Sequence, residues 1–160
     1  YEHSGIFAYS LSISCNHCKD PACLRSCPTQ ALGKRDDGIV FIDQDLCIGC
    51  RNCLTECPYD VPSYDPETNK TDKCDFCRDA MDIGEKPVCV SSCPMRALDC
   101  GEYDRLLAEH PENNLSIYPL PSPDTTSPAL VITPNRGADN SRAALIGLEE
   151  DSYASYGYKE

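Results

Sequence analysis

All thirteen cysteines of this 160-residue chain except Cys100 fall into three regularly spaced groups. The most regular group runs from Cys47 to Cys57 with the spacing C-x2-C-x2-C-x3-C, and Pro58 follows it. Thiolates at this spacing bind [4Fe–4S] cubanes: the first three ligate one cluster and the fourth ligates another. Pro58 ends the helical turn before it, because proline has no N–H to donate and clashes with the preceding turn. The group therefore requires a partner group elsewhere in the chain.

Two further groups vary the same pattern, one before and one after it. The first group has two extra residues before its third cysteine, and the third group has eleven residues between Cys77 and Cys89. The sequence after the last cysteine of the first group, Cys-Pro-Thr-Gln-Ala-Leu, returns after the third as Cys-Pro-Met-Arg-Ala-Leu. Such self-similarity marks an internal repeat. We therefore predict three half-ferredoxin units.

The rule that the fourth cysteine crosses to the other cluster assigns the ligands of two complete clusters. The first cluster is predicted to be held by Cys15, Cys18, Cys23 and Cys57. The second is predicted to be held by Cys47, Cys50, Cys53 and Cys27. These eight cysteines form a closed set.

The third group is left incomplete by the same rule. Cys74, Cys77 and Cys89 begin a third cluster without a fourth ligand, and Cys93 is the single crossed ligand of a fourth cluster. We expect the missing motif upstream of Tyr1, so that the chain is a fragment or has lost half of a four-cluster relay. Cys100 belongs to no group, and it is either a buried free thiol or a substitute ligand.

Other chemistries for these cysteines are disfavoured. Thirteen is an odd number, which excludes complete disulfide pairing. Paired C-x2-C knuckles also bind structural zinc, but zinc sites do not need three thiolates in series or a proline after the last cysteine. Zinc at the incomplete third site stays open. His17 lies between two cysteines of the first group, and we do not expect it to be a ligand because four cysteines already serve the cluster.

Composition limits the partners and the core. The formal net charge is −12, which argues against a nucleic-acid or anionic-lipid surface. No run of 18 apolar residues and no signal peptide is visible. Apolar residues other than cysteine are sparse, and we expect the clusters to act as the core, as metals do in other small folds.

The rest of the chain predicts an α+β fold of ferredoxin-like modules, built of short helices and β-hairpins. The Asp37-Gly38 pair predicts a tight primed turn in a hairpin across residues 31–43. A second hairpin is expected with strands at 61–64 and 70–73, and one short helix closed by Gly84 is expected in the insert 78–88.

The predicted domains follow the cysteine groups. We expect an extended first strand in residues 1–14 as the remnant of a longer N-terminus, a complete two-cluster module in 15–58, and half of a second module in 59–100. Residues 101–160 are expected to form a short helix and a long extended tail that binds a partner, because the tail from Pro111 holds six of the thirteen prolines and no cysteine.

The sequence resembles the iron–sulfur subunits of anaerobic dimethyl sulfoxide reductases and, more broadly, the four-cluster ferredoxin subunits of molybdopterin oxidoreductases. The resemblance rests on the cysteine groups with their flanking residues. The flanking segments are residues 7–18, 20–23, 35–38, 45–51, 56–59, 71–74, 86–87 and 92–98. It implies an electron-transfer subunit without a catalytic site of its own. Electrons would pass from a quinol-oxidising membrane anchor subunit through the clusters to a molybdopterin-containing catalytic subunit.

The resemblance also implies a location at the periphery of the cell membrane, with clusters assembled in the cytoplasm. Two other readings stay open. One is a soluble polyferredoxin that diffuses between partners, and the other is a structural zinc-binding interaction module. The sequence does not identify the substrate of the catalytic partner or the face of the membrane.

Overall fold

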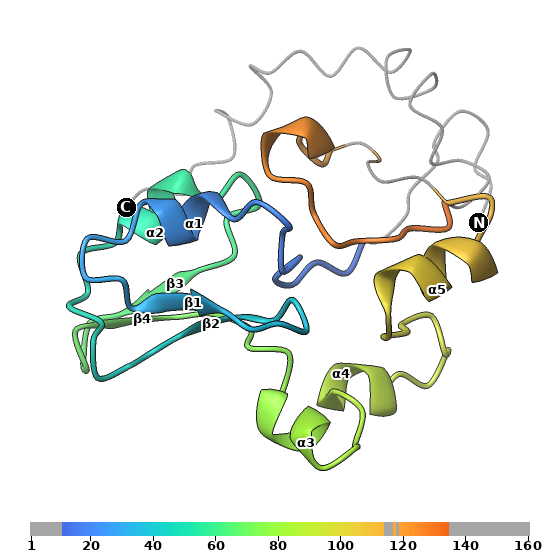
Figure 1. The fold of residues 1–160 in the computed structure, drawn as a ribbon, viewed down its shortest axis with the longest axis horizontal. Helices are drawn as coiled ribbons and strands as arrows, with labels where there is room; N and C mark the ends of the chain where they lie inside the picture. Colours follow the sequence, from blue (N-terminus) through green and yellow to red (C-terminus); the bar gives the residue numbers. More distant parts are fainter. Residues whose placement is uncertain (1–10, 114–116, 118, 135–160) are drawn as a thin grey trace, which may run out of the picture.

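The computed structural model describes residues 11–113, 117 and 119–134, and over these the chain has the expected α+β fold of short helices and small antiparallel sheets (Figure 1). The helices are α1 (Ala22–Arg25), α2 (Asn52–Glu56), α3 (Arg78–Asp82), α4 (Val88–Ser91) and α5 (Tyr103–Glu109), with one 3-10 turn, η1 (Pro123–Thr125). The strands are β1 (Leu32–Lys34), β2 (Val40–Ile42), β3 (Ser63–Asp65) and β4 (Lys70–Asp72). None of the helices in the described residues has the length and hydropathy of a membrane span.

The first hairpin pairs β1 with β2 in the register Leu32↔Ile42, Gly33↔Phe41 and Lys34↔Val40. Its turn is wider than the predicted two-residue primed turn, which was wrong. The Arg35 N–H donates to the Ile39 carbonyl, the Gly38 N–H donates to the Arg35 carbonyl, and Gly38 has a φ of 89°. This is a three-residue loop in which a glycine in the left-handed region follows a type I turn.

The second hairpin pairs β3 with β4, close to the predicted ranges. Its turn touches the loop of the second cysteine group: a Cβ added to Gly49 would lie 2.3 Å from the Asn69 carbonyl oxygen. Gly49 also has a φ of 68°. Only glycine meets both conditions without strain, so this residue allows the hairpin turn to approach the cysteine loop.

The core is small, as the sparse apolar composition predicted, and it contains cysteine. It lies where β1 and β2 meet the first two cysteine groups. Its buried members are Ala31, Leu32, Val40, Ile42, Cys47 and Cys53, with Cys23, Leu24, Cys27 and Leu54 packed against them. The short helices α1 and α2 lie side by side over these strands (Figure 1).

The internal repeat is visible in the backbone. The residue two positions after the first cysteine has a positive φ in all three groups: 40° at His17, 68° at Gly49 and 63° at Phe76. The residue three positions after the last cysteine also has a positive φ in all three. These are Gln30, Asp60 and Arg96, at 56°, 51° and 50°. Non-glycine residues seldom adopt this conformation, so the threefold recurrence supports the three-unit reading of the sequence.

The third cysteine group is carried by α3 and α4. The predicted helix in its insert is α3, and the Gly84 N–H donates to the Met81 carbonyl just beyond its end with a φ of 82° at Gly84. The predicted helix after Gly101 is α5, and Pro111 follows it by two residues.

The described part of the tail has no helix or strand beyond η1 and an isolated bridge at Ile132. It packs on the first cysteine loop through three backbone hydrogen bonds: Lys19 N–H to the Ser127 carbonyl at 2.8 Å, Asp20 N–H to the Thr126 carbonyl at 3.1 Å, and Ala129 N–H to the Asn16 carbonyl at 2.9 Å. Thr126 is 1% exposed. Residues 126–129 therefore cover this loop.

Two predicted regions fall wholly or partly outside the described residues. Of the expected first strand in 1–14, residues 11–14 lie in no strand and residues 1–10 are not described. The part of the tail from 135 to 160 is not described either.

Candidate iron–sulfur centres

The second predicted ligand set lines one pocket. Cysteines from two groups that are far apart in the sequence meet there, with the core strand residues Leu32 and Ile42 on its wall. The cysteines are Cys27, Cys47, Cys50 and Cys53. Cys27 therefore lies beside cysteines of the second group, which are distant from it in the sequence. Four thiols around one pocket match the donor set of a [4Fe–4S] cluster.

Thr71 gives an independent test of the fit. Its hydroxyl is buried in the wall of the same pocket, with the residue 1% exposed and no hydrogen-bond partner in the described structure. The group it reaches is the Cys53 thiol. Burial raises the pKa of Cys53, and the adjacent Thr71 side chain opposes that rise. A buried hydroxyl without a partner carries a large desolvation cost, and a thiolate ligand sulfur supplies the missing acceptor.

The thiols of the first predicted ligand set interact electrostatically with one another. Burial raises the pKa of the Cys23 thiol to about 11, and the neighbouring thiols Cys15, Cys57 and Cys18 raise it further. Cys57 comes from the second group, so this interaction also joins two groups. Metal ligation requires the thiolate form, and iron supplies the positive charge that these crowded thiols lack.

Each of the two short helices serves both sets. Helix α1 carries Cys23, which interacts with the first set, and Cys27 follows two residues after its end and lies in the second pocket. Helix α2 carries Cys53 of the second pocket and is capped by Cys57, which interacts with Cys23. The two predicted sites are thus joined by two helical turns. The ligand assignment itself stays a prediction.

The crossed cysteines of the first and third groups lie in equivalent cradles of backbone N–H groups. At Cys27 burial raises the pKa, but hydrogen bonds from the backbone of Leu32, Ala31 and Thr29 and from the Thr29 side chain outweigh it and lower the pKa overall. The pKa of Cys93 is lowered mainly by backbone hydrogen bonds from Ala97 and Leu98. Donors aimed at a thiolate stabilise its charge. The repeated Cys-Pro-x-x-Ala-Leu sequence is therefore an anion cradle.

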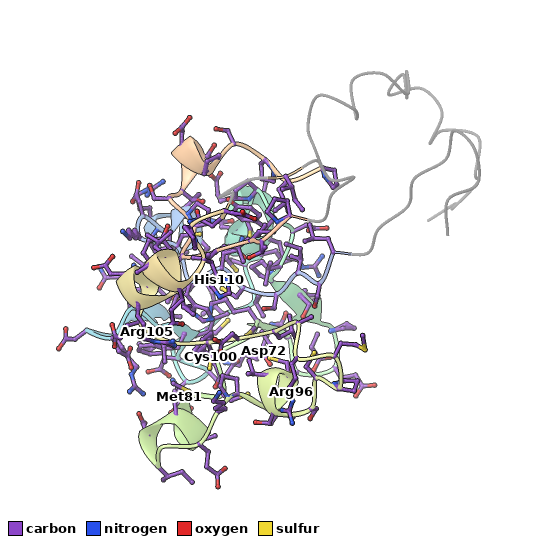
Figure 2. All side chains as sticks on the ribbon, turned by 90° about the vertical axis from the view of Figure 1, so that its right-hand side faces the viewer. Asp72, Met81, Arg96, Cys100, Arg105 and His110 are labelled. Atoms are coloured by element: carbon purple, nitrogen blue, oxygen red, sulfur yellow. The ribbon has the colours of Figure 1, made fainter. Side chains whose placement is uncertain are left out.

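The third group is more exposed. Cys89 is exposed, and Cys74, Cys77 and Cys93 are half-buried. The carbonyl of Cys100 accepts a hydrogen bond from Arg105 at 3.2 Å (Figure 2). Burial and then the Asp99 carboxylate raise the pKa of the Cys100 thiol, and Cys89 contributes to the same rise. Cys100 therefore lies near the third group, and both readings of it stay open.

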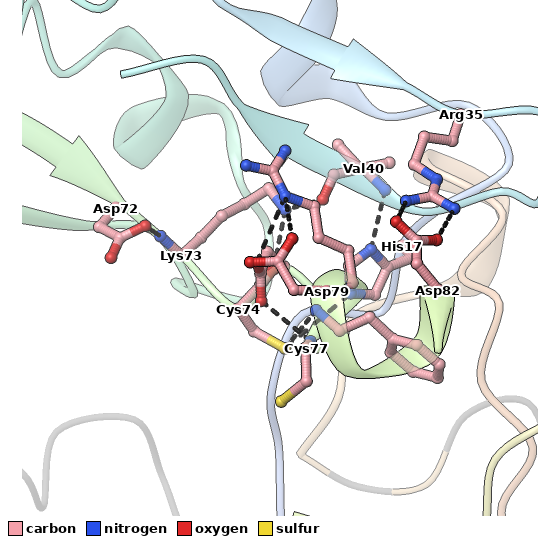
Figure 3. Close-up of polar contacts among 12 residues, drawn as sticks. His17, Arg35, Val40, Asp72, Lys73, Cys74, Cys77, Asp79 and Asp82 are labelled. Atoms are coloured by element: carbon pink, nitrogen blue, oxygen red, sulfur yellow. Dashed lines mark hydrogen bonds and ion pairs between the residues drawn. The ribbon is translucent and has the colours of Figure 1, made fainter. Parts of the chain in front are cut away.

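His17 has a role that the sequence did not indicate. It is 7% exposed, and its Nδ1 accepts a hydrogen bond from the Val40 N–H at 2.9 Å. Burial and the nearby Lys73 ammonium lower the pKa of His17 to about 4. The neutral ring therefore carries its proton on Nε2, which lies 3.9 Å from Cys74 Sγ (Figure 3).

This contact places a first-group residue against a third-group thiol. The His17 ring also meets Phe76 edge-on, with centroids 5.2 Å apart. The signal available in the sequence was only the position of a histidine inside a cysteine loop. Contacts to Val40 and Cys74 depend on how distant segments pack, which spacing does not show.

Comparison with known proteins agrees with this geometry. Residues 6–103 match the family described as the 4Fe-4S dicluster domain. This chain is a member of that family. Its cofactors are [4Fe–4S] clusters, and the cysteine pocket with its unpartnered threonine hydroxyl fits them.

Among curated relatives, the chain is 49% identical over 136 residues to the B subunit of anaerobic dimethyl sulfoxide reductase from Haemophilus influenzae, covering 85% of this chain and 66% of that protein. It is 50% identical over 133 residues to the protein of the same name from Escherichia coli K12, covering 83% and 64%. It is 39% identical over 131 residues to the B subunit of polysulfide reductase from Wolinella succinogenes, covering 77% and 66%. The chain thus spans slightly under two thirds of these relatives. The resemblance seen in the sequence is confirmed.

Proposed function

We propose that this chain is an electron-transfer subunit that relays electrons from a quinol-oxidising membrane anchor to a molybdopterin-containing catalytic subunit. The observation that carries the proposal is the crossing of cysteines between two adjacent sites, because one helix then supplies sulfur to both. It is supported by relatives that are named as subunits of dimethyl sulfoxide and polysulfide reductases. In this role the chain carries electrons, and the substrate is reduced on its partner.

A bound [4Fe–4S] cluster takes up and releases single electrons, at a potential set by charge, hydrogen bonds to sulfur and solvent exposure. The residues of this chain hold the two proposed sites together and screen them. The core strands exclude water from one side of the second pocket, and residues 126–129 cover the first cysteine loop. The cradles at Cys27 and Cys93 and the donors at Cys53 and Cys74 place hydrogen bonds on ligand sulfur.

The proposed ligand sets are those predicted from the sequence. The first set is Cys15, Cys18, Cys23 and Cys57, and the second is Cys47, Cys50, Cys53 and Cys27. We further propose that Cys74, Cys77 and Cys89 belong to a third site and that Cys93 is a crossed ligand of a fourth. The proposed location is the periphery of the cell membrane, within a complex that the anchor subunit holds there.

Electron paramagnetic resonance on anaerobic membranes that contain this protein tests the relay. A quinol should reduce the clusters in membranes, and a sulfoxide or polysulfide should reoxidise them, depending on the catalytic partner. The purified chain without its partners should respond to neither compound but should be reduced by dithionite. This control separates loss of the partners from loss of the clusters.

The alternative is a soluble polyferredoxin carrier. It predicts that the protein purifies without a molybdenum-containing subunit and that its clusters exchange electrons with soluble reductases but not with quinol in membranes. That result would contradict the relay.

A further inference from the structure

Three lysines hold the cysteine loops in the same way. Lys34 and Lys70 lie in hairpin strands and Lys73 directly follows β4. Each donates from its ammonium to the backbone carbonyl of a cysteine in a different group. Lys34 donates to the Cys18 carbonyl at 2.6 Å, Lys70 donates to the Cys47 carbonyl at 2.5 Å, and Lys73 donates to the Cys74 carbonyl at 2.9 Å. The two hairpins thus place one ammonium group beside each cysteine group.

These ammonium groups are not paired with acids. Each makes its second hydrogen bond to another carbonyl: Lys34 to Lys19, Lys70 to Gln44, and Lys73 to Val40 (Figure 3). Within the described residues, none of the three has a carboxylate within ion-pair distance. The cations that do form ion pairs lie elsewhere. They are Arg25, Arg35, Arg78, Lys86 and Arg105.

Lys73 is the most buried of the three lysines, with only 9% of the residue exposed. A buried ammonium group without a counter-ion is costly, and carbonyl dipoles offset only part of that cost. Its ammonium group lies against the Val40 and Cys74 carbonyls, and the Val40 N–H donates to His17 inside the first cysteine loop, so the charge lies between the first and third groups. In a sequence with 26 acidic residues and a net charge of −12, this lysine binds backbone carbonyls instead of carboxylates.

We propose that Lys34, Lys70 and Lys73 are the counter-charges of the bound clusters and raise their reduction potentials. A cluster with four thiolate ligands is anionic, and the electron that reduces it adds one more negative charge. A nearby positive charge therefore stabilises the reduced form, and it does so more strongly where water is excluded. Lys73 serves the first and third sites, Lys70 the second and Lys34 the first. The inference rests on the ligand sets proposed above but not on the relay.

The test is a mediated redox titration of the purified iron–sulfur protein with dithionite, followed by electron paramagnetic resonance. Lys73→Gln removes the charge and keeps an amide donor, and it should shift the midpoint potential of at least one cluster to a lower value. The signal of the second site should stay where it is. Lys73→Arg keeps the charge, and its midpoints should lie close to those of the unmodified protein.

Lys86→Gln is the matched control. It makes the same change in net charge, but its ammonium group is exposed and lies 3.9 Å from the Asp99 carboxylate. The potentials of the first and second sites should not move in this variant.

Lys70→Gln keeps the proposal testable if Lys73→Gln does not fold with its clusters. Lys70 is half-buried, and its variant should lower the potential of the second site alone. Unchanged potentials in Lys70→Gln, or a shift in Lys86→Gln as large as in the other variants, would overturn the proposal. Dithionite reduces the clusters without partners, so failure of the relay would leave these titrations intact.

Discussion

The two parts of the molecule, residues 15–73 and residues 74–100, share a repeated backbone but differ in what surrounds it. The first part contains both hairpins and every residue of the core cluster, whereas the second buries Val90 but exposes three large apolar side chains. Ile83 is 74% exposed, Val88 64% and Met95 82%. The left-handed residues at equivalent positions show that the loop conformation recurs with the cysteine pattern in both parts. Burial comes from the hairpins inserted between the cysteine groups.

The largest difference should appear when one ligand is removed from each part. Cys53 is 6% exposed in the core pocket, so Cys53→Ser should remove the second cluster and about four irons per chain. Cys89 is exposed and lies outside the two closed sets, so Cys89→Ser should keep both clusters. Iron and sulfide counts after anaerobic reconstitution measure the effect.

The 160-residue chain should contain about eight irons after this reconstitution. Equal losses of iron in Cys53→Ser and Cys89→Ser would show that the two parts do not differ in how their cysteines hold clusters. A count of about twelve that falls to about eight in Cys100→Ser would identify Cys100 as a ligand of the third site.

A matched pair of valines compares the packing of the two parts. Val40 is 1% exposed in the core, and Val40→Ala should lower the free energy of unfolding by about 2–3 kcal/mol, because it leaves a cavity. Val88 is 64% exposed, and Val88→Ala should change it by less than about 0.5 kcal/mol. Anaerobic denaturant titration, followed by circular dichroism, gives both values. Similar losses would mean that Val88 is covered in solution.

His17 joins the two parts, and its loss should have a smaller effect. His17→Leu leaves the buried Val40 N–H without its acceptor, which should cost about 1–2 kcal/mol. His17→Gln can supply an acceptor and a donor, so it should recover part of the loss. The same titration measures both, and an unchanged stability in His17→Leu would contradict the assigned hydrogen bond.

The smallest effect is expected from an exposed ion pair between the parts. Arg35 binds Asp82 through two hydrogen bonds, at 3.0 and 2.5 Å (Figure 3). Exposed pairs contribute little and are screened by salt. Asp82→Asn should therefore lower the unfolding midpoint less than His17→Leu does. Added salt should bring the midpoints of Asp82→Asn and the unmodified protein together. Asp79→Asn is the control, because the Asp79 side chain is 98% exposed.

The sequence predicted the features that depend on local chemistry. The cysteine spacing and the Cys-Pro repeat indicated the units, and the Asp37-Gly38 pair indicated the first hairpin. It did not predict the wider turn at Gly38, because a two-residue and a three-residue loop share the same Asp-Gly signal. The contacts of His17 and Lys73 were also missed. Both residues contact partners from other segments, and local patterns contain no information on such pairing.

Residues 126–129 have one further consequence, for the order in which the protein matures. They bind the loop of Asn16 to Asp20 from far along the sequence, and a ribosome completes the loop long before it makes the segment that covers it. During synthesis Cys15 and Cys18 stay open to whatever donor delivers iron and sulfide. The growing chain thus passes through a stage in which the first cysteine loop is complete and residues 126–129 do not yet cover it, and this stage gives the cofactor an interval in which to enter.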